Sequence, residues 1–354
     1  MTEHSGNITI SICMIVRNEE AVLERCLNSV RGVYDQLVIV DTGSEDETVS
    51  IARRFTDEVF CEPWENDFGK ARNSSFSHAR SDYIIYLDAD DVLPEEEKEK
   101  LLKLKTELYA LPEDERPRTI LMSYDVPEAG GISFRQRMVA RHDDRPYWHG
   151  AIHECMDYEK PVMTTDITFL HRKLVQPPKD RNCNIIRAIT REELKNNFWL
   201  SAQCYLDMLL AGHEDEAEEY FNMCEDEAGS NISVVAGSGV GTNPDTTCDT
   251  GDDRYTGYPY MDICLQLAST LNHHKLWEGA FRWVKLSERI WSDYSGAVYD
   301  NSVLLMLYQQ GVKALTGLGR LEEAVLYNEK VLELAPDNRA ALMNRAYFAK
   351  KLKS

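Results

Sequence analysis

"DYIIYLDADD", residues 82–91, runs from a buried-strand pattern directly into three carboxylates, Asp88, Asp90 and Asp91, separated only by Ala89. Alternate side chains of a strand share a face, so Asp88 and Asp90 are predicted to point the same way. Two carboxylates about 4 Å apart repel by several kcal/mol at an intermediate dielectric unless a cation lies between them. Mn²⁺ or Mg²⁺ removes this conflict and completes its coordination with substrate phosphate oxygens. The segment predicts a metal site for a diphosphate; strand-ending or helix-capping aspartates are the alternative.

Strand and helix patterns alternate around this segment. ITISICMIV, QLVIV, DEVF and YIIYL are strand-like, and helical patterns lie between them, one of which has Ser44 and Glu47 in capping-box spacing. This alternation is typical of a parallel sheet with covered faces, in which ligands bind beyond the carboxyl ends of the strands. Asp41 and Asp88 each follow a strand directly, so we expect both at one rim. A helix over residues 94–110 and the strands RTILMSY, SFRQRMVAR and TTDITFLH follow.

The pattern changes after Pro177 and Pro178, and the rest of the chain is almost entirely helical. Three helical segments share a turn followed by a small residue, Ala217, Ala280 or Ala324. Their spacing is looser than the strict tetratricopeptide period of about 34 residues. We therefore predict an α/β domain over 1–178 and a tetratricopeptide-like helical-hairpin domain over 179–354, with any other all-helical domain as the alternative for the second part. Residues 229–254, rich in Gly, Ser, Thr and Asp, are expected to form a long loop.

Composition excludes several classes of partner. The 354 residues carry a net charge of −21 without a basic cluster, which argues against binding to nucleic acid. No apolar run approaches the length of a membrane-spanning helix, and the start MTEHSGNITI lacks a secretory signal pattern. The nine cysteines are scattered without a CxxC pair, which favours reduced thiols. We expect a cytoplasmic protein.

Four segments carry a family resemblance: ISICMIVRNEE, LVIVDTGSEDET, KARNSSF and YIIYLDADD. In this order and spacing they resemble the family 2 glycosyltransferases with the GT-A fold, over roughly residues 8–175. Further on, YWHGAIHE and ITFLHRK resemble a subgroup in which a tetratricopeptide-like region follows the catalytic domain. That subgroup includes bacterial enzymes that glycosylate peptides and proteins, among them bacteriocin precursors modified on Cys or Ser.

The resemblance implies a metal site and a nucleotide site. Asp88 and Asp90 match the family's DxD metal motif, and His171 stands where such enzymes often place a third metal ligand. Asp41 matches the acidic residue that contacts the nucleoside. Thr42 occupies the position of a second Asp in many relatives, so recognition of the base can differ from that of uridine.

The resemblance also implies the remaining donor contacts and a base. Arg72 and Asn73 match an element near the diphosphate, and Ala89 belongs to the same donor-binding segment. Glu154 matches the position of the catalytic base. His153 competes with it, because neighbouring residues of a strand formed by HGAIHE would face opposite ways.

The predicted function is a metal-dependent, inverting transfer of a sugar from a nucleoside diphosphate donor, a UDP-sugar by resemblance, to a peptide or protein. The nucleophile would be Ser, Thr or Cys, and the helical half would hold the acceptor. A saccharide or cell-surface glycan acceptor, a nucleotidyltransferase and a non-catalytic scaffold remain as alternatives. Nucleotidyltransferases usually carry a Gly-rich phosphate loop after the first strand, where this chain has VRNEE. The sugar and the oligomeric state are not predicted.

Overall fold

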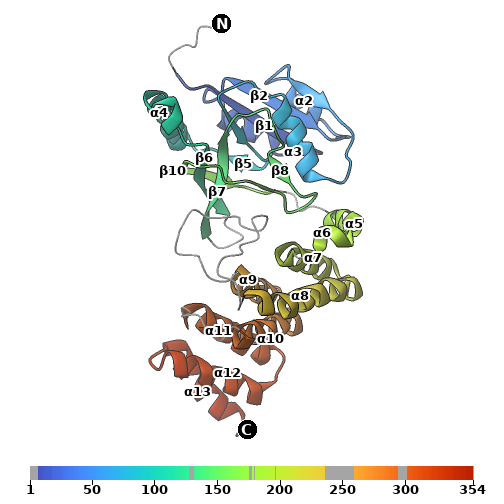
Figure 1. Cartoon of the computed structure of the whole chain (residues 1–354), viewed down its shortest axis with the longest axis vertical. Coiled ribbons are helices and arrows are strands. Elements are labelled where there is room, and N and C mark those ends of the chain that lie inside the picture. The colour runs from blue at the N-terminus through green and yellow to red at the C-terminus, as the bar shows by residue number, and fades with distance from the viewer. Residues whose placement is uncertain are drawn as a thin grey trace. The chain divides into compact units, whose positions relative to one another are not determined.

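An eight-stranded sheet is the centre of the first of two units, which ends at Ile185; the second begins at Ile186 (Figure 1). The computed structural model describes residues 7–126, 131–174, 178, 180–195, 197–235, 259–293 and 301–353. The strands of the sheet are β1 (Ile10–Val16), β2 (Gln36–Asp41), β3 (Val59–Cys61), β4 (Tyr83–Tyr86), β5 (Asp91–Val92), β6 (Thr119–Val126), β7 (Gly131–Ala140) and β10 (Val162–His171). A separate pair consists of β8 (Trp148–His149) and β9 (Cys155–Met156).

The strand order is β3-β2-β1-β4-β7-β6-β10-β5. The first four strands of that order are parallel, β7 is antiparallel to both β4 and β6, and β10 returns parallel to β6. The carboxyl ends of β1, β2 and β4 therefore lie at one rim, as the alternating strand and helix patterns predict. The mostly parallel α/β class expected for this part of the chain is confirmed.

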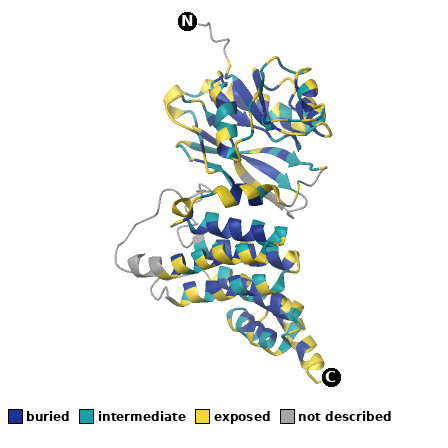
Figure 2. Ribbon diagram, turned by 90° about the vertical axis from the view of Figure 1, so that its right-hand side faces the viewer, coloured by how far each residue is buried: buried dark blue, intermediate teal, exposed yellow. Residues whose placement is uncertain are grey.

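Both faces of the sheet are covered, because the central strands are apolar on each side. Ile10, Ile12 and Met14 of β1 belong to one buried cluster, whereas Cys13 belongs to another together with Val38 of β2. These strands are dark blue in Figure 2. The helices are α1 (Leu23–Ser29), α2 (Thr48–Ala52), α3 (Phe68–Ser77), α4 (Glu95–Ala110) and the 3₁₀ turn η1 (Glu113–Glu115).

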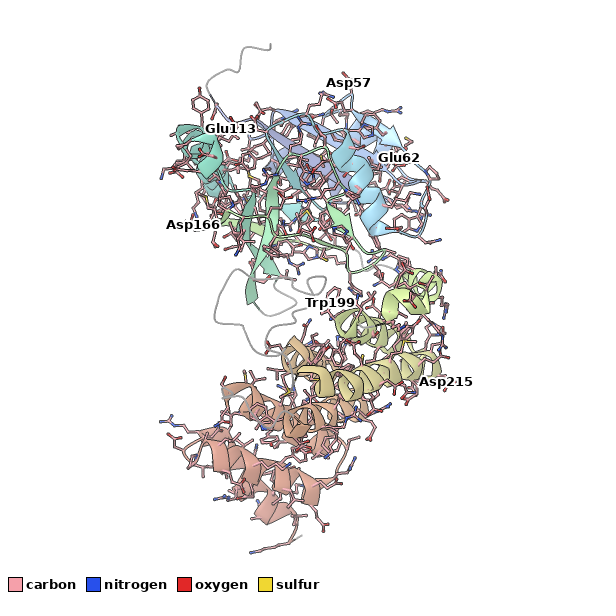
Figure 3. All side chains as sticks on the ribbon, in the orientation of Figure 1. Asp57, Glu62, Glu113, Asp166, Trp199 and Asp215 are labelled. Carbon is pink, nitrogen blue, oxygen red and sulfur yellow. The ribbon has the colours of Figure 1, made fainter. Side chains whose placement is uncertain are left out.

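Two of these helices pack directly on strands of the sheet. Helix α3 packs on β1 and β2, and α4 packs on β10. At the α4 contact, Asp166 of β10, labelled in Figure 3, pairs with Lys100 at 3.1 Å. The predicted capping box of α2 is wrong: its N-cap is Glu47 without a side-chain cap, and Ser44 Oγ instead accepts from the Asn18 amide at 2.9 Å.

The second unit is helical throughout its described residues. After α5 (Arg181–Ala188) come α6 (Arg191–Leu194), α7 (Phe198–Ala211), α8 (Glu214–Val235), α9 (Pro259–His273), α10 (Trp277–Asp293), α11 (Asn301–Gly317), α12 (Leu321–Leu334) and α13 (Arg339–Lys351). Helices α7 and α8, α9 and α10, and α11 and α12 pack as consecutive pairs. The structure describes no helix with the length and apolar character that crossing a membrane requires.

The expected small residues lie at the contacts between the two helices of each pair. Ala217, Ala280 and Ala324 are buried near the start of the second helix of each pair, which lets two backbones approach. The helical-hairpin prediction is confirmed for this unit. The predicted loop over 229–254 begins too early, because α8 continues to Val235; positions 236–254 lie outside the described residues.

Replacing Gly311 of α11 tests the closeness of this packing. A Cβ there would lie 2.7 Å from Cδ1 of Tyr327 and 3.3 Å from Cγ1 of Val284. We expect Gly311→Ala to lower stability by about 1–3 kcal/mol through overpacking. Gly229→Ala is the matched control, since a Cβ at Gly229 meets no atom within 4 Å, and helix entropy should raise its stability by roughly 0.4–1 kcal/mol. Urea unfolding followed by circular dichroism measures both; a Gly311 variant as stable as the control contradicts the packing.

Candidate active site

The acidic segment follows β4 at the rim formed by the parallel strands. Residues 88–91 form a turn closed by a hydrogen bond from the Asp91 amide to the Asp88 carbonyl, at 3.0 Å. The strand-like alternation expected for Asp88 and Asp90 is therefore wrong, and a turn brings them together instead. Burial, together with the Asp88 and Asp91 carboxylates, raises the pKa of Asp90 against the opposing effect of His171. Ala89 is buried between the two aspartates.

Arg72 of α3 links this segment to the predicted base. Its Nη2 lies 3.0 Å from Asp88 Oδ1, and its Nε donates to Glu154 Oε1 at 2.7 Å. The guanidinium lies over the rings of Tyr86 and Trp148, at 5.3 and 4.9 Å from their centroids. Burial favours the neutral form of Asp88, yet the Arg72 and Arg137 charges outweigh it and hold the pKa of Asp88 below its usual value. The structure thus brings three of the predicted residues into one chain of contacts.

Glu154 reaches this position from a loop. Strand β8 stops at His149, and β9 begins only at Cys155, so HGAIHE does not form the continuous strand that was expected. The backbone turns because Gly150 and His153 both adopt positive φ, +92° and +52°. Glu154 and His153 therefore lie in a loop, where the alternation of side chains along a strand does not decide which of them faces the site. Glu154 contacts Arg72, and His153 is partly buried beside it in sequence.

Asn73 holds that loop. Its Oδ1 accepts from the amides of Tyr147 and Trp148, each at 2.9 Å, and its Nδ2 donates to the Trp148 carbonyl at 2.8 Å. Next to it, the Phe68 amide at the start of α3 donates to the Ala151 carbonyl at 2.8 Å. Asn73 therefore connects α3 to β8. The donor contact expected of Asn73 would have to use its remaining N–H.

Asp41 and Thr42 lie at the end of β2. One Asp41 oxygen, Oδ2, accepts from the amides of Gly43 and Ser44, both at 3.1 Å. The other, Oδ1, is buried and has no hydrogen-bond partner among the described residues, although the residue is only 3% exposed. Thr42 donates from its hydroxyl to the Val16 carbonyl at 3.2 Å, so its side chain ties β2 to β1. Asp41, rather than Thr42, thus presents an unused acceptor.

His171 ends β10 next to the acidic segment. Its Nδ1 lies 3.4 Å from Asp90 Oδ1 and 3.3 Å from Asp91 Oδ1, and one potential ligand atom from each of these three residues lies within 4.8 Å of the others. The hydrogen bond to Asp91 raises the pKa of His171, with Asp90 and Asp88 adding to the effect. The predicted metal ligands Asp90 and His171 are close together. Asp88 adjoins them but is paired with Arg72.

The chain matches a known family over most of the first unit. Residues 11–156 match the model described as Glycosyl transferase family 2. These residues form a family 2 glycosyltransferase domain. The matched region includes Asp41, Arg72, the acidic segment and Glu154, and it ends before His171. The family resemblance inferred from the four sequence segments is confirmed.

Two curated relatives each match part of the chain. The SPbeta prophage-derived glycosyltransferase SunS of Bacillus subtilis is 30% identical over 210 residues, which cover 56% of this chain and 49% of SunS. A TPR repeat-containing protein of Synechococcus elongatus is 33% identical over 154 residues, which cover 42% of this chain and 35% of that protein. The chain thus spans about half the length of SunS and less of the second relative.

Solved structures resemble the chain only distantly. Staphylococcus aureus TarS, residues 1–349 with UDP-GlcNAc, is 13% identical with a TM-score of 0.42, covering 88% of this chain and 89% of that chain. Glucosyl-3-phosphoglycerate synthase of Mycobacterium tuberculosis with Mg²⁺ and UDP is 24% identical with a TM-score of 0.27, covering 33% and 44%.

Four residues of the site had no role in the sequence-based prediction. Glu19, after β1, is one: burial first, then the Asp90 and Asp88 charges, raise its pKa to about 7. The others are Asp91, Tyr124 of β6 and Arg137 of β7, which form one hydrogen-bonded group. Asp91 was visible as the third carboxylate of the acidic segment. Nothing in the sequences of β6 and β7 indicates that they supply its partners.

The hydrogen bonds from Asn73 to the backbone of Tyr147 and Trp148 predict how firmly the loop after β8 is held. Asn73→Ala removes three hydrogen bonds from the backbone of residues 147–148, so amides between 147 and 156 should exchange with deuterium at least about tenfold faster, a change of about 1.4 kcal/mol in opening free energy. Ser77→Ala on the same helix is the control, because Ser77 is exposed and bonds only within α3. Hydrogen-exchange mass spectrometry measures both; unchanged protection of this loop in Asn73→Ala would show that other contacts hold it.

Proposed function

We propose that this chain is a glycosyltransferase that takes a sugar from a nucleoside diphosphate donor, a UDP-sugar by family resemblance. The observation that carries the proposal is the gathering of the acidic segment, Arg72 and Glu154 at one rim of a family 2 glycosyltransferase domain. The glycosyltransferase SunS is 30% identical over 56% of this chain, but only 49% of SunS is covered. The activity of the whole protein is therefore part of the proposal.

The side chains near the acidic segment suit a divalent cation. Asp90 and His171 belong, with Asp91, to a group whose potential ligand atoms lie within 4.8 Å of one another, a mixed oxygen and nitrogen set compatible with Mn²⁺ and with Mg²⁺. Asp88, the other expected ligand, lies next to Ala89 in the same segment and is paired with Arg72. Burial first, and then the Asp88 and Asp91 carboxylates, raise the pKa of Asp90, and a cation beside Asp90 would offset both effects. When bound, such an ion supplies Lewis-acid stabilisation of the diphosphate leaving group.

The donor's nucleoside and diphosphate have separate partners. The buried Oδ1 of Asp41 is suited to accept a hydrogen bond from the base or ribose, because leaving it unpaired costs about 1–3 kcal/mol or more. Arg72 can contribute a second cationic contact to the diphosphate region through its Nη2, which now meets Asp88. Asp41 ends β2, and Arg72 belongs to α3.

Glu154 is the proposed base. Its carboxylate is largely buried and is oriented by Arg72 Nε, so it is held in one position before the acceptor arrives. In that position Glu154 would take the proton of the attacking hydroxyl or thiol. Attack opposite the leaving group would invert the anomeric centre, as the family resemblance implies.

A peptide or protein acceptor, bound by the helical unit and modified on Ser, Thr or Cys, completes the proposal. Arrays of helical hairpins form extended surfaces for such partners. Between α8, α10 and the start of α12 lies an open groove of about 630 Å³ lined by Phe221, Phe281, Arg282, Lys285 and Arg289 among others. The cytoplasmic location also belongs to the proposal, supported by the eight described cysteines, which are all free thiols.

The acceptor class is tested with a labelled UDP-sugar and a cell lysate. Label recovered in protease-sensitive material supports a peptide or protein acceptor. Label confined to glycan or lipid fractions rules it out while leaving glycosyl transfer intact.

The metal scheme predicts the effect of Asp90→Asn. Loss of this carboxylate should reduce Mn²⁺-dependent release of nucleoside diphosphate from UDP-sugars at least about 100-fold, since the ligand and its charge are both removed. Asp57→Asn, at an exposed aspartate labelled in Figure 3, should retain wild-type release. Coupled detection of the nucleoside diphosphate, with and without Mn²⁺, measures the rate. Full activity of Asp90→Asn contradicts the metal scheme, and no release by the wild type with any donor favours a scaffold.

The base assignment predicts a different result for Glu154→Gln. Glutamine can still accept from Arg72 but cannot take a proton, so kcat should fall about 10²–10⁴-fold while donor affinity changes little. Glu113→Gln, at an exposed residue of η1, is the control. Steady-state kinetics and calorimetric titration with the nucleoside diphosphate separate the two effects. Unchanged turnover in Glu154→Gln would leave Glu154 only as an anchor for Arg72.

A further inference from the structure

Asp91 is the most enclosed member of the acidic segment. It is 0% exposed and opens the short strand β5, which pairs antiparallel with the end of β10. In that pairing Asp91 lies directly opposite His171, and Val92 lies opposite Leu170. The strand register therefore joins the acidic segment to the histidine expected to complete the metal site.

Every acceptor position of Asp91 is engaged by the protein. Oδ1 accepts from the Tyr124 hydroxyl at 2.8 Å and lies 3.3 Å from His171 Nδ1. The same Tyr124 hydroxyl lies 2.8 Å from His171 Nδ1, so Tyr124 and Asp91 hold that nitrogen together. Oδ2 accepts from Arg137 Nη2 at 2.8 Å and from the Asp88 amide at 3.3 Å. A carboxylate offers about four lone-pair sites, so these contacts leave none for an ion.

Arg137 balances the charge of Asp91 inside the protein. It is 1% exposed, and its guanidinium lies 4.4 Å from the ring centroid of Tyr86 and 4.3 Å from that of Tyr124. The pairing of β6 with β7 shifts register between Ile120 and Leu121, so that Arg137 has no paired residue on β6. Such irregularities re-aim side chains next to active sites.

We propose that Asp91 is not a metal ligand but the positioning residue of the metal site, with Arg137 as its charge partner. The inference rests on the proposed function, because it concerns the same Mn²⁺ or Mg²⁺ site. Asp91 accepts a hydrogen bond from the Asp88 amide on one side of the site and lies beside His171 Nδ1 on the other. It thereby helps to position both Asp88 and His171. A histidine whose Nδ1 is hydrogen-bonded to a carboxylate presents Nε2 to a metal, in a fixed orientation.

This arrangement predicts effects from residues that cannot touch the ion. Outer partners of metal ligands typically change metal affinity by about 10–100-fold when they are removed. Tyr124→Phe deletes one hydroxyl and keeps the ring, so the protein should fold normally and bind Mn²⁺ about 10-fold more weakly. Arg137→Met should weaken Mn²⁺ binding at least as much. Because this change leaves the buried Asp91 carboxylate without its cation, the double variant Asp91→Asn with Arg137→Met, which removes both charges, is tested as well. Arg135→Met is the matched control, because Arg135 also lies over Tyr124, at 4.9 Å, but is exposed.

The experiment titrates the full chain with Mn²⁺ alone and reads free Mn²⁺ by its electron paramagnetic resonance signal, with thermal unfolding to check the fold. Weakened binding in Tyr124→Phe and in the double variant, with wild-type binding in Arg135→Met, supports the inference. Wild-type binding in both overturns it while leaving the metal scheme standing. If the wild-type chain itself binds no Mn²⁺, the metal part of the proposed function fails, and this inference fails with it.

A second reading separates positioning from general support of the fold. The ¹⁵N shifts of the His171 ring report which nitrogen carries the proton, with the signals identified by their loss in His171→Asn. The wild type should show a protonated Nδ1, and adding Tyr124→Phe to the double variant, which changes both nearby partners of Nδ1, should abolish that preference. The same tautomer population in the wild type and this triple variant overturns the positioning role.

Discussion

Negative charge concentrated at one rim of the sheet is the constraint on which the site depends. Two neighbouring segments supply four carboxylates, those of Glu19, Asp88, Asp90 and Asp91. Two largely buried arginines neutralise only part of this negative charge. Arg72 pairs with Asp88, and Arg137 pairs with Asp91. Asp90 has no arginine partner among the described residues, and its pKa is raised, as is that of Glu19. Asp90 has His171 Nδ1 beside it, at 3.4 Å, instead of an arginine, and it is the carboxylate at which a cation is proposed to bind.

The topology of the sheet brings these groups together from distant parts of the chain. Parallel β1, β2 and β4 deliver their carboxyl ends to one rim, and antiparallel β5 then ties the acidic segment to β10. A shift of β10 by one residue would turn His171 to the opposite face of the sheet. The contacts of His171 Nδ1 with Tyr124, at 2.8 Å, and with Asp91, at 3.3 Å, oppose such a shift. Fold stability and site geometry thus depend on the same contacts.

The features that sequence could predict are local, and the features it missed depend on register. Apolar runs fixed the strands, and DADD was recognisable because its carboxylates are adjacent in the chain. The turn at 88–91 and the loop at 150–154 differ from the strands expected there, and positive φ at a residue such as His153 leaves no clear sequence signal. Arg137 looked like any polar strand residue, because its burial comes from a register shift opposite Leu121 that no local pattern encodes. Asn73 was visible, but its partners lie 74 and 75 positions away.

One guanidinium serves both halves of the proposed reaction. Arg72 contacts Asp88 on the metal side and Glu154 on the acceptor side, and it is too enclosed to lose both partners without a large desolvation cost. If Asp88 turns toward a cation, the bond from Arg72 Nε to Glu154 is the one that remains. Filling the donor site then strengthens the orientation of the base instead of disturbing it. The Glu154 carboxylate lies on a loop, but its partner Arg72 belongs to α3. The helix therefore holds the position of the proposed base.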